Sequence, residues 1–190
     1  MFDTILQATG LILGLIYLYY EYHANPRLWI VGLFMPMISM TVYFRKGLYA
    51  DFGMSAYYLL MAVYGFLAWT GRIGRRKTEL PIRHAGLRVC LVTGVITAAI
   101  WVAIAFFLIY VTDSTVPWAD AFTTALSIAG TWMLARKYIE QWWIWVAVDA
   151  VSTALYIYKG IYPYALLYAI YTIVAILGYY KWRRLMSLSS

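Results

Sequence analysis

Long uncharged stretches separated by short charged segments dominate this chain of 190 residues. Six windows of 15 to 24 residues contain no charged side chain, and a seventh, Gln141–Tyr158, contains only Asp149. The six windows are residues 4–20, 28–44, 52–71, 89–112, 121–135 and 160–180. A helix that crosses a bilayer needs about 20 mostly apolar residues. The pattern therefore predicts an all-α membrane protein with seven transmembrane helices and no room for a separate soluble domain.

The composition and the first window narrow the class further. Hydrophobic residues make up 64% of the chain and charged residues only 12%, whereas about a quarter of the residues of a soluble domain are charged. The first charge is the acidic Asp3, and the window after it ends in tyrosines and Glu21 rather than in small residues. We therefore expect a first span and not a removable signal peptide. The single Cys90 excludes a disulfide framework.

Lysines and arginines are concentrated on one side of the predicted bundle. Twelve of the 15 lie on the side opposite the N-terminus, six of them between Arg72 and Arg88. Because the basic loops of membrane proteins are the cytoplasmic ones, we expect the N-terminus outside and the C-terminus inside. The basic cluster is interpreted as a topology signal, and no nucleic-acid partner is expected.

The chain also contains an internal repeat with an offset of 113 residues. Between Trp29 and Trp69, 11 of 41 positions are identical to their counterparts, among them Lys46-Gly47 and Lys159-Gly160. The repeat pairs spans 1 to 3 with spans 5 to 7 and leaves span 4 as a linker helix, so the two three-helix units run parallel. We expect a first repeat over residues 1–71, a basic inner loop and linker helix over 72–112, and a second repeat over 113–190.

One face of the sixth predicted span carries polar and aromatic side chains. At about 100° per residue, five of them fall within an arc of about 80°: Trp142, Trp145, Asp149, Ser152 and Tyr156. An ionisable side chain inside a membrane indicates a functional site, because it is costly to bury. No lysine or arginine lies at the same depth, so a cationic ligand is the expected partner of Asp149; a hydrogen bond to a neighbouring helix is the alternative. Trp142 fits the aromatic belt at the membrane interface equally well.

A second polar stripe and the repeat add further candidates. In the fifth span, polar side chains recur every three or four residues, a spacing that suits either ligand binding or helix packing. The repeat counterpart of Asp149 is Pro36, and a proline in a membrane helix is typical of a bending point, so we assign its stripe to gating. The further substrate-binding candidates are Gln7, Trp29, Ser55, Tyr58, Asp120, Thr124, Ser127, Tyr168 and Tyr171, and the gating candidates are Pro36, Ser39 and Tyr43.

The sequence contains no pattern typical of catalysis or of a bound cofactor. The two histidines, His23 and His84, lie in predicted loops, so no pair can hold a metal or haem inside the bilayer. No glycine-rich phosphate-binding loop precedes a helix. We expect neither an enzyme nor a cofactor.

Several of these segments resemble the PnuC family of bacterial vitamin transporters. The resembling segments include Trp142-Trp-Ile-Trp145 with Asp149, which is the most specific part, and Gly178-Tyr-Tyr-Lys-Trp182, and the similarity extends over nearly the whole chain. It implies a bundle of three, one and three helices, similar in plan to SWEET sugar transporters, in the bacterial inner membrane. It also implies uncoupled passage of an unphosphorylated vitamin that a cytoplasmic kinase then traps.

Branches of that family differ in substrate between nicotinamide riboside, thiamine and riboflavin. The segment Met54-Ser55-Ala-Tyr57-Tyr58 is more similar to the thiamine branch, so we expect thiamine ahead of nicotinamide riboside. Both are cations with a flat aromatic ring, which suits tryptophan stacking and Asp149, whereas riboflavin is neutral. Besides the vitamin, the kinase and the bilayer, association between copies of the chain stays open. A seven-helix sensor and, third, a membrane enzyme are the alternatives from other classes.

Overall fold

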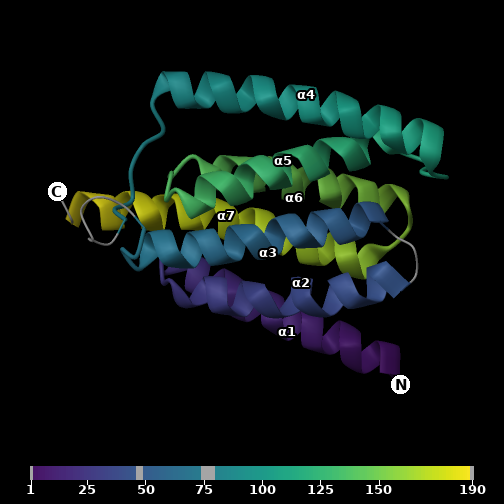
Figure 1. Cartoon of the computed structure of the whole chain (residues 1–190), viewed down its shortest axis with the longest axis horizontal. Coiled ribbons are helices and arrows are strands. Elements are labelled where there is room, and N and C mark those ends of the chain that lie inside the picture. The colour runs from purple at the N-terminus through teal and green to yellow at the C-terminus, as the bar shows by residue number, and fades with distance from the viewer. Residues whose placement is uncertain (1, 46–48, 74–79, 189–190) are drawn as a thin grey trace. The chain divides into compact units, whose positions relative to one another are not determined.

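The computed structural model describes residues 2–45, 49–73 and 80–188. Within these ranges it contains seven α-helices and no β-structure except one isolated bridge (Figure 1). The helices are α1 (Phe2–Tyr22), α2 (Arg27–Arg45), α3 (Tyr49–Trp69), α4 (Leu87–Val111), α5 (Pro117–Ala135), α6 (Gln141–Tyr158) and α7 (Tyr162–Leu188). The predicted all-helical architecture is confirmed.

Three of these helices are long and apolar enough to cross a membrane by their own composition. They are Phe52–Trp69 within α3, Leu87–Val111 and Tyr162–Leu188. The other four have 18 to 21 residues, which also fits the length of about 20 residues that a span needs.

The chain divides into two compact units, Met1–Pro81 and Ile82–Ser190. In the first unit, α2 packs against both α1 and α3. In the second unit, α6 packs against both α5 and α7, and α4 packs along α5 (Figure 1). The parallel arrangement of the two repeats and the sides on which the termini lie stay predictions.

A pair of tryptophans joins α2 to α3 in the first unit. The rings of Trp29 and Trp69 are perpendicular, with centroids 5.7 Å apart. The indole of Trp29 occupies the space that a side chain at Gly65 would need. Only glycine at this position of α3 lets the backbone approach the indole so closely.

The same contact recurs at the equivalent positions of the second unit. Trp142 of α6 and Trp182 of α7 are perpendicular, with centroids 5.6 Å apart. A Cβ at Gly178 would lie 2.6 Å from the ring of Trp142. The repeat seen in the sequence therefore extends to side-chain packing, and we call each cluster a Trp–Gly–Trp contact.

One end of the second unit is rich in cations, and we call it the basic end. It comprises residues 82–88, 136–140 and 181–184, where α4 and α6 begin and where α5 ends. Backbone hydrogen bonds from Arg83 N to Lys137 O and from Ile139 N to Arg83 O tie the two loops together, both at 3.1 Å. The carboxylate of Glu140 accepts from His84 Nδ1 and from the Ala85 amide, each at 2.8 Å. The start of α4 is thus fixed to the α5–α6 turn.

The opposite end of this unit, the far end, comprises residues 112–117 and 159–162. There the chain reverses between α6 and α7 at Gly160, whose φ of 71° lies in the left-handed region that favours glycine. The Ile161 amide donates to Tyr156 O at 2.8 Å and closes the end of α6. This turn sets the register of α6 against α7 near the far end.

Candidate functional site

The carboxylate of Asp149 lies buried near the middle of α6. Asp149 is the ninth of the 18 residues of this helix, and its side chain is only 6% exposed. Within the described part of the chain, it forms no hydrogen bond or ion pair. Ser152, one turn closer to the far end, is also buried. Because an unpaired buried charge is strongly unfavourable, this position suits a cationic ligand.

Four tyrosines lead from the far end toward Asp149, and we call them the tyrosine column. Tyr156 of α6 stacks between Tyr164 and Tyr168 of α7, with centroid distances of 5.4 and 5.2 Å and interplanar angles of 25° and 16°. Tyr168 meets Tyr171 edge-on at 5.9 Å. The phenols of Tyr168 and Tyr171 interact electrostatically with Asp149. The predicted candidates Tyr156, Tyr168 and Tyr171 are therefore brought together in one column of rings.

Trp145 of the predicted stripe lies against α5. A Cβ at Gly130 would lie 3.3 Å from its ring, so a glycine makes room for the indole. Its Nε1 is buried and has no hydrogen-bond partner in the described structure. Trp145 therefore combines a large aromatic face with an N–H donor that a ligand can use.

Trp142 has a different environment from Trp145. It is 1% exposed, and its ring is enclosed by Gly178 and Trp182 in the Trp–Gly–Trp contact. The structure thus places Trp142 in the packing of α6 on α7 and not in an exposed belt. Trp143, which the helical wheel put off the stripe, is 48% exposed.

The polar stripe of α5 is hydrogen-bonded largely within its own helix. Thr124 Oγ1 donates to Asp120 O, Ser127 Oγ to Thr123 O, and Thr131 Oγ1 to Ser127 O, each at 2.8 Å. These bonds use the hydroxyl protons and leave the oxygens as acceptors. The hydroxyls are thus satisfied within α5, and contact of Thr124 or Ser127 with a ligand stays a prediction.

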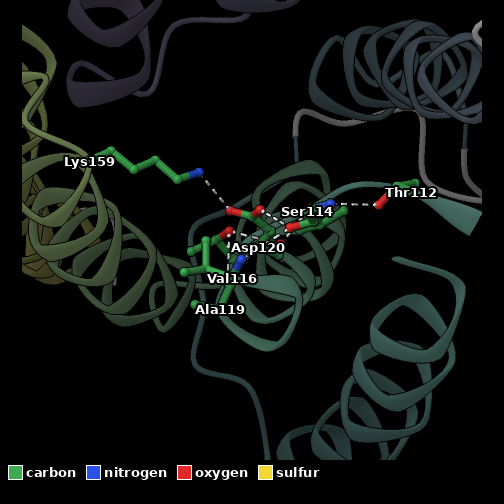
Figure 2. A network of polar contacts seen from close by, with 8 residues as sticks. Thr112, Ser114, Val116, Ala119, Asp120 and Lys159 are labelled. Carbon is green, nitrogen blue, oxygen red and sulfur yellow. Dashed lines mark hydrogen bonds and ion pairs between the residues drawn. The ribbon is translucent and has the colours of Figure 1, made fainter. Parts of the chain in front are cut away.

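Asp120 belongs to a polar network at the far end (Figure 2). Its Oδ2 accepts from Ser114 Oγ at 2.8 Å, and its Oδ1 lies 3.6 Å from Lys159 Nζ. Ser114 N donates to Thr112 Oγ1 at 3.3 Å. The network joins the α4–α5 loop to the end of α6. Unlike Asp149, Asp120 already has a cation beside it.

The candidates of the first unit have varied surroundings. Ser55 is buried in α3, and Tyr58 is half-buried beside Tyr57, with ring centroids 5.6 Å apart. Trp29 is enclosed by the first Trp–Gly–Trp contact, and Pro36 lies inside α2. The side chains of Gln7, Ser39 and Tyr43 lie outside the described part of the structure. Contact of these residues with substrate, and their roles in gating, stay predictions.

Sequence reasoning missed two features of this region. Tyr164 was not selected because its repeat counterpart is not a tyrosine, although Tyr164, Tyr168 and Tyr171 follow the three- and four-residue spacing of one helix face. The pair of Asp120 and Lys159 was missed because the two residues are 39 positions apart. Among the described residues, no cluster of three or more His, Cys, Asp or Glu side chains could hold a metal ion.

Comparison with known proteins places this arrangement in a family. Residues 4–184 match the family described as nicotinamide mononucleotide transporter. The chain is 25% identical over 201 residues to the nicotinamide riboside transporter PnuC of Escherichia coli (strain K12), covering 93% of this chain and 84% of that protein. It is also 25% identical over 176 residues to the riboflavin/roseoflavin transporter RibM of Streptomyces davaonensis, covering 91% and 82%.

A solved structure has the same fold. The crystal structure of the vitamin B3 transporter PnuC superposes with a TM-score of 0.74 at 20% identity, over 99% of this chain and 84% of that one. The resemblance inferred from the Trp142 and Gly178 segments is thereby confirmed. Because the family match covers nearly the whole sequence, this chain belongs to the nicotinamide mononucleotide transporter family, and it is a multi-pass membrane protein.

Proposed function

We propose that this chain carries an unphosphorylated, cationic B-vitamin across the membrane by facilitated diffusion. The observation that carries the proposal is the buried carboxylate of Asp149, which has no hydrogen-bond or ion-pair partner among the described residues and interacts electrostatically with Tyr168 and Tyr171 of the tyrosine column. A cationic ring satisfies the carboxylate and is attracted by aromatic faces. The relatives support vitamin transport, because their names refer to nicotinamide riboside, riboflavin and vitamin B3.

Each group of the proposed site has a separate task. Asp149 faces the positive region of the vitamin, and Trp145 stacks on its ring and offers Nε1 as a donor. Ser152 and the tyrosine column line the path toward the far end. Trp142 contributes by holding α6 against α7, because its ring is already enclosed.

Two vitamins meet these requirements. Thiamine is the first candidate, because the segment from Met54 to Tyr58 resembles the thiamine branch of the family. Nicotinamide riboside is the second, because the relative from Escherichia coli is named for it. Riboflavin, for which another relative is named, is neutral and leaves the Asp149 charge unpaired.

The same site explains a trapping step. With the basic end in the cytoplasm, the vitamin leaves toward a kinase that adds a phosphate. A phosphate carries close to two negative charges at neutral pH, and the Asp149 carboxylate repels it. The bacterial inner membrane, with its inside-negative potential, then favours accumulation without a coupling ion.

Binding and uptake measured together test the proposal. Purified protein is titrated with thiamine, nicotinamide riboside and riboflavin, and each labelled vitamin is then offered to vesicles that contain the protein. We expect saturable binding and equilibrating uptake of one cationic vitamin, with the other two as weaker competitors. Absence of binding and of uptake for all three vitamins in folded protein would reject the proposal. Transport of riboflavin alone would reject the statement that the substrate is a cation.

A further inference from the structure

A long apolar groove separates α4 from α5 and α6 in the second unit. Its volume is about 480 Å³. Small residues provide the space, among them Gly94 of α4 and Ala125 and Ala129 of α5. Along α4 the lining extends from Cys90 to Trp101, 11 residues farther on, which corresponds to about 16 Å of helix. Of the residues of α4, only Ala105 is buried, so the protein itself leaves this face of α4 largely uncovered.

The lining offers few groups for hydrogen bonding. Thr97 Oγ1 donates to Thr93 O at 2.7 Å, and Trp101 Nε1 donates to Trp118 O at 2.9 Å. The carboxylate of Glu140 is held by His84 and by the Ala85 amide. Because these polar atoms are already paired, the groove favours a hydrocarbon chain over a polar ligand.

Positive charge is gathered where the groove begins. Glu140 lines the groove at the basic end, and its carboxylate accepts a hydrogen bond from His84 Nδ1 at 2.8 Å. The guanidinium of Arg83 lies 4.8 Å from the centroid of the Tyr138 ring, and its Nε is buried without a hydrogen-bond partner in the described structure. Arg136 follows the lining residue Met133 at the end of α5. Arg83 and Arg136 therefore lie close in the chain or through backbone hydrogen bonds to the residues that line this end of the groove.

The groove has the dimensions of one membrane leaflet. Half of a hydrocarbon core of about 30 Å is about 15 Å, close to the length lined by α4, and the charged end lies where a head group would be. Basic sites between transmembrane helices are typical places for acidic lipid head groups. We propose that this groove binds one acyl chain of an anionic phospholipid whose phosphate contacts Arg83 and Arg136.

Native mass spectrometry of the purified protein tests this site directly. Phosphatidylglycerol and phosphatidylcholine with identical acyl chains are added separately to delipidated protein. The number of lipid molecules that stay bound to each protein is then measured at increasing detergent concentration. Gly94→Leu fills the groove, since a Cβ at Gly94 meets nothing within 4 Å, and Ala99→Leu places the same side chain at an exposed position of α4 outside the lining. Arg83→Gln and Arg136→Gln each remove a positive charge proposed to face the lipid head group. Circular dichroism and thermal unfolding confirm that each variant folds.

We expect the unmodified protein and Ala99→Leu to retain phosphatidylglycerol in preference to phosphatidylcholine, and Gly94→Leu to lose both lipids. Each arginine substitution should reduce the preference about fivefold, since one basic side chain near the surface contributes about 1 kcal/mol. Equal retention by folded Gly94→Leu would overturn the proposal. It would also be overturned if the groove held a second copy of the chain, seen as a lipid-free dimer that Gly94→Leu dissociates.

Discussion

Among the described residues, the buried carboxylate of Asp149 has no hydrogen-bond or ion-pair partner, whereas the carboxylates of Asp120 and Glu140 are paired. Asp120 has Ser114 and Lys159, and Glu140 has His84 and the Ala85 amide. A structural acid in a membrane helix would be expected to show contacts of this kind. Their absence around Asp149 in the described structure is the reason to assign it to a ligand.

Exchange of Asp149 for Asn tests this assignment at constant shape. Affinity for the vitamin should fall by about 1–3 kcal/mol, or about 5- to 150-fold, because a charge-assisted contact is lost. The change is measured by titration calorimetry on folded protein. Asp113→Asn, the same substitution at an exposed position of the α4–α5 loop, serves as the control. Unchanged affinity in folded Asp149→Asn would assign the carboxylate to structure.

The tyrosine column gives a second prediction for single residues. Tyr156→Leu removes the ring that stacks on both Tyr164 and Tyr168 and should weaken binding by about 0.5–2 kcal/mol, the range of a cation–π contact. Tyr156→Phe keeps the ring and should retain most of the affinity. Tyr158→Leu alters a tyrosine of the same helix that is 77% exposed and should have no effect. Equal losses in the Tyr156 and Tyr158 leucine variants would show that the stacked ring does not contact substrate.

Pairs of helices are held together by contacts that the repeat duplicates. The Trp–Gly–Trp contact joins α2 to α3 and α6 to α7, and in each case a glycine permits the close approach. Such contacts suit membrane helices, whose association depends on close packing rather than on the hydrophobic effect. The pair α2 and α3 and the pair α6 and α7 should therefore each move as a rigid body.

Gly178→Ala should destabilise the protein by about 1–3 kcal/mol, because the new Cβ would overlap the Trp142 ring. Thermal unfolding in detergent measures the effect. Gly53→Ala is the matched control: its Cβ meets nothing within 4 Å, and alanine favours helix over glycine by about 1 kcal/mol. Trp142→Leu combined with Gly178→Ala should be less destabilising than the sum of the single changes. If the effects of the two changes are additive, Trp142 and Gly178 do not interact energetically.

Pro36 within α2 gives a prediction about motion. A proline removes one helical hydrogen bond and lets the helix bend. Pro36→Ala should slow transport while leaving the equilibrium affinity within a few-fold, as measured by uptake and titration of the same preparation. A large loss of affinity at normal turnover would place Pro36 in binding instead of gating.

For the whole molecule, we predict transport without a coupling ion. Proton relays generally use several Asp, Glu or His side chains, and in the second unit Asp149 is the acid buried at mid-helix, where the vitamin cation engages it. The membrane potential can still drive accumulation, since one positive charge gains about 2.3 kcal/mol per 100 mV, equivalent to about 50-fold.

Vesicles without ion gradients or a membrane potential test this prediction. Labelled vitamin should equilibrate and go no further, and enclosed kinase with ATP should then produce accumulation. Vesicles with kinase but no ATP control for binding of the vitamin to the enzyme. Accumulation driven by a proton or sodium gradient alone, with the potential clamped at zero, would contradict uncoupled transport.

Local properties of the sequence account for the elements and for part of the site. Six uncharged windows and a seventh with a single charge predicted the seven helices, because a helix in lipid must satisfy its own backbone and present apolar side chains along one span. Helical periodicity correctly put Trp145, Asp149, Ser152 and Tyr156 on one face and Trp143 off it, since the angle between residues is a local property of the helix.

The partners of each side chain were decided only by the tertiary structure. Trp142 and Trp145 have the same residue type and lie on the same predicted stripe, and among the described residues neither buried Nε1 has a hydrogen-bond partner. Their rings nevertheless differ in surroundings, because Trp142 is enclosed by Gly178 and Trp182 of α7 while Trp145 lies against Gly130 of α5. Asp120 and Asp149 are likewise both acids on helices, and the contacts of Asp120 with Ser114 and Lys159 distinguish the two. Periodicity specifies the face of a helix, whereas contacts between helices depend on their rotation and depth, which arise when all helices pack together.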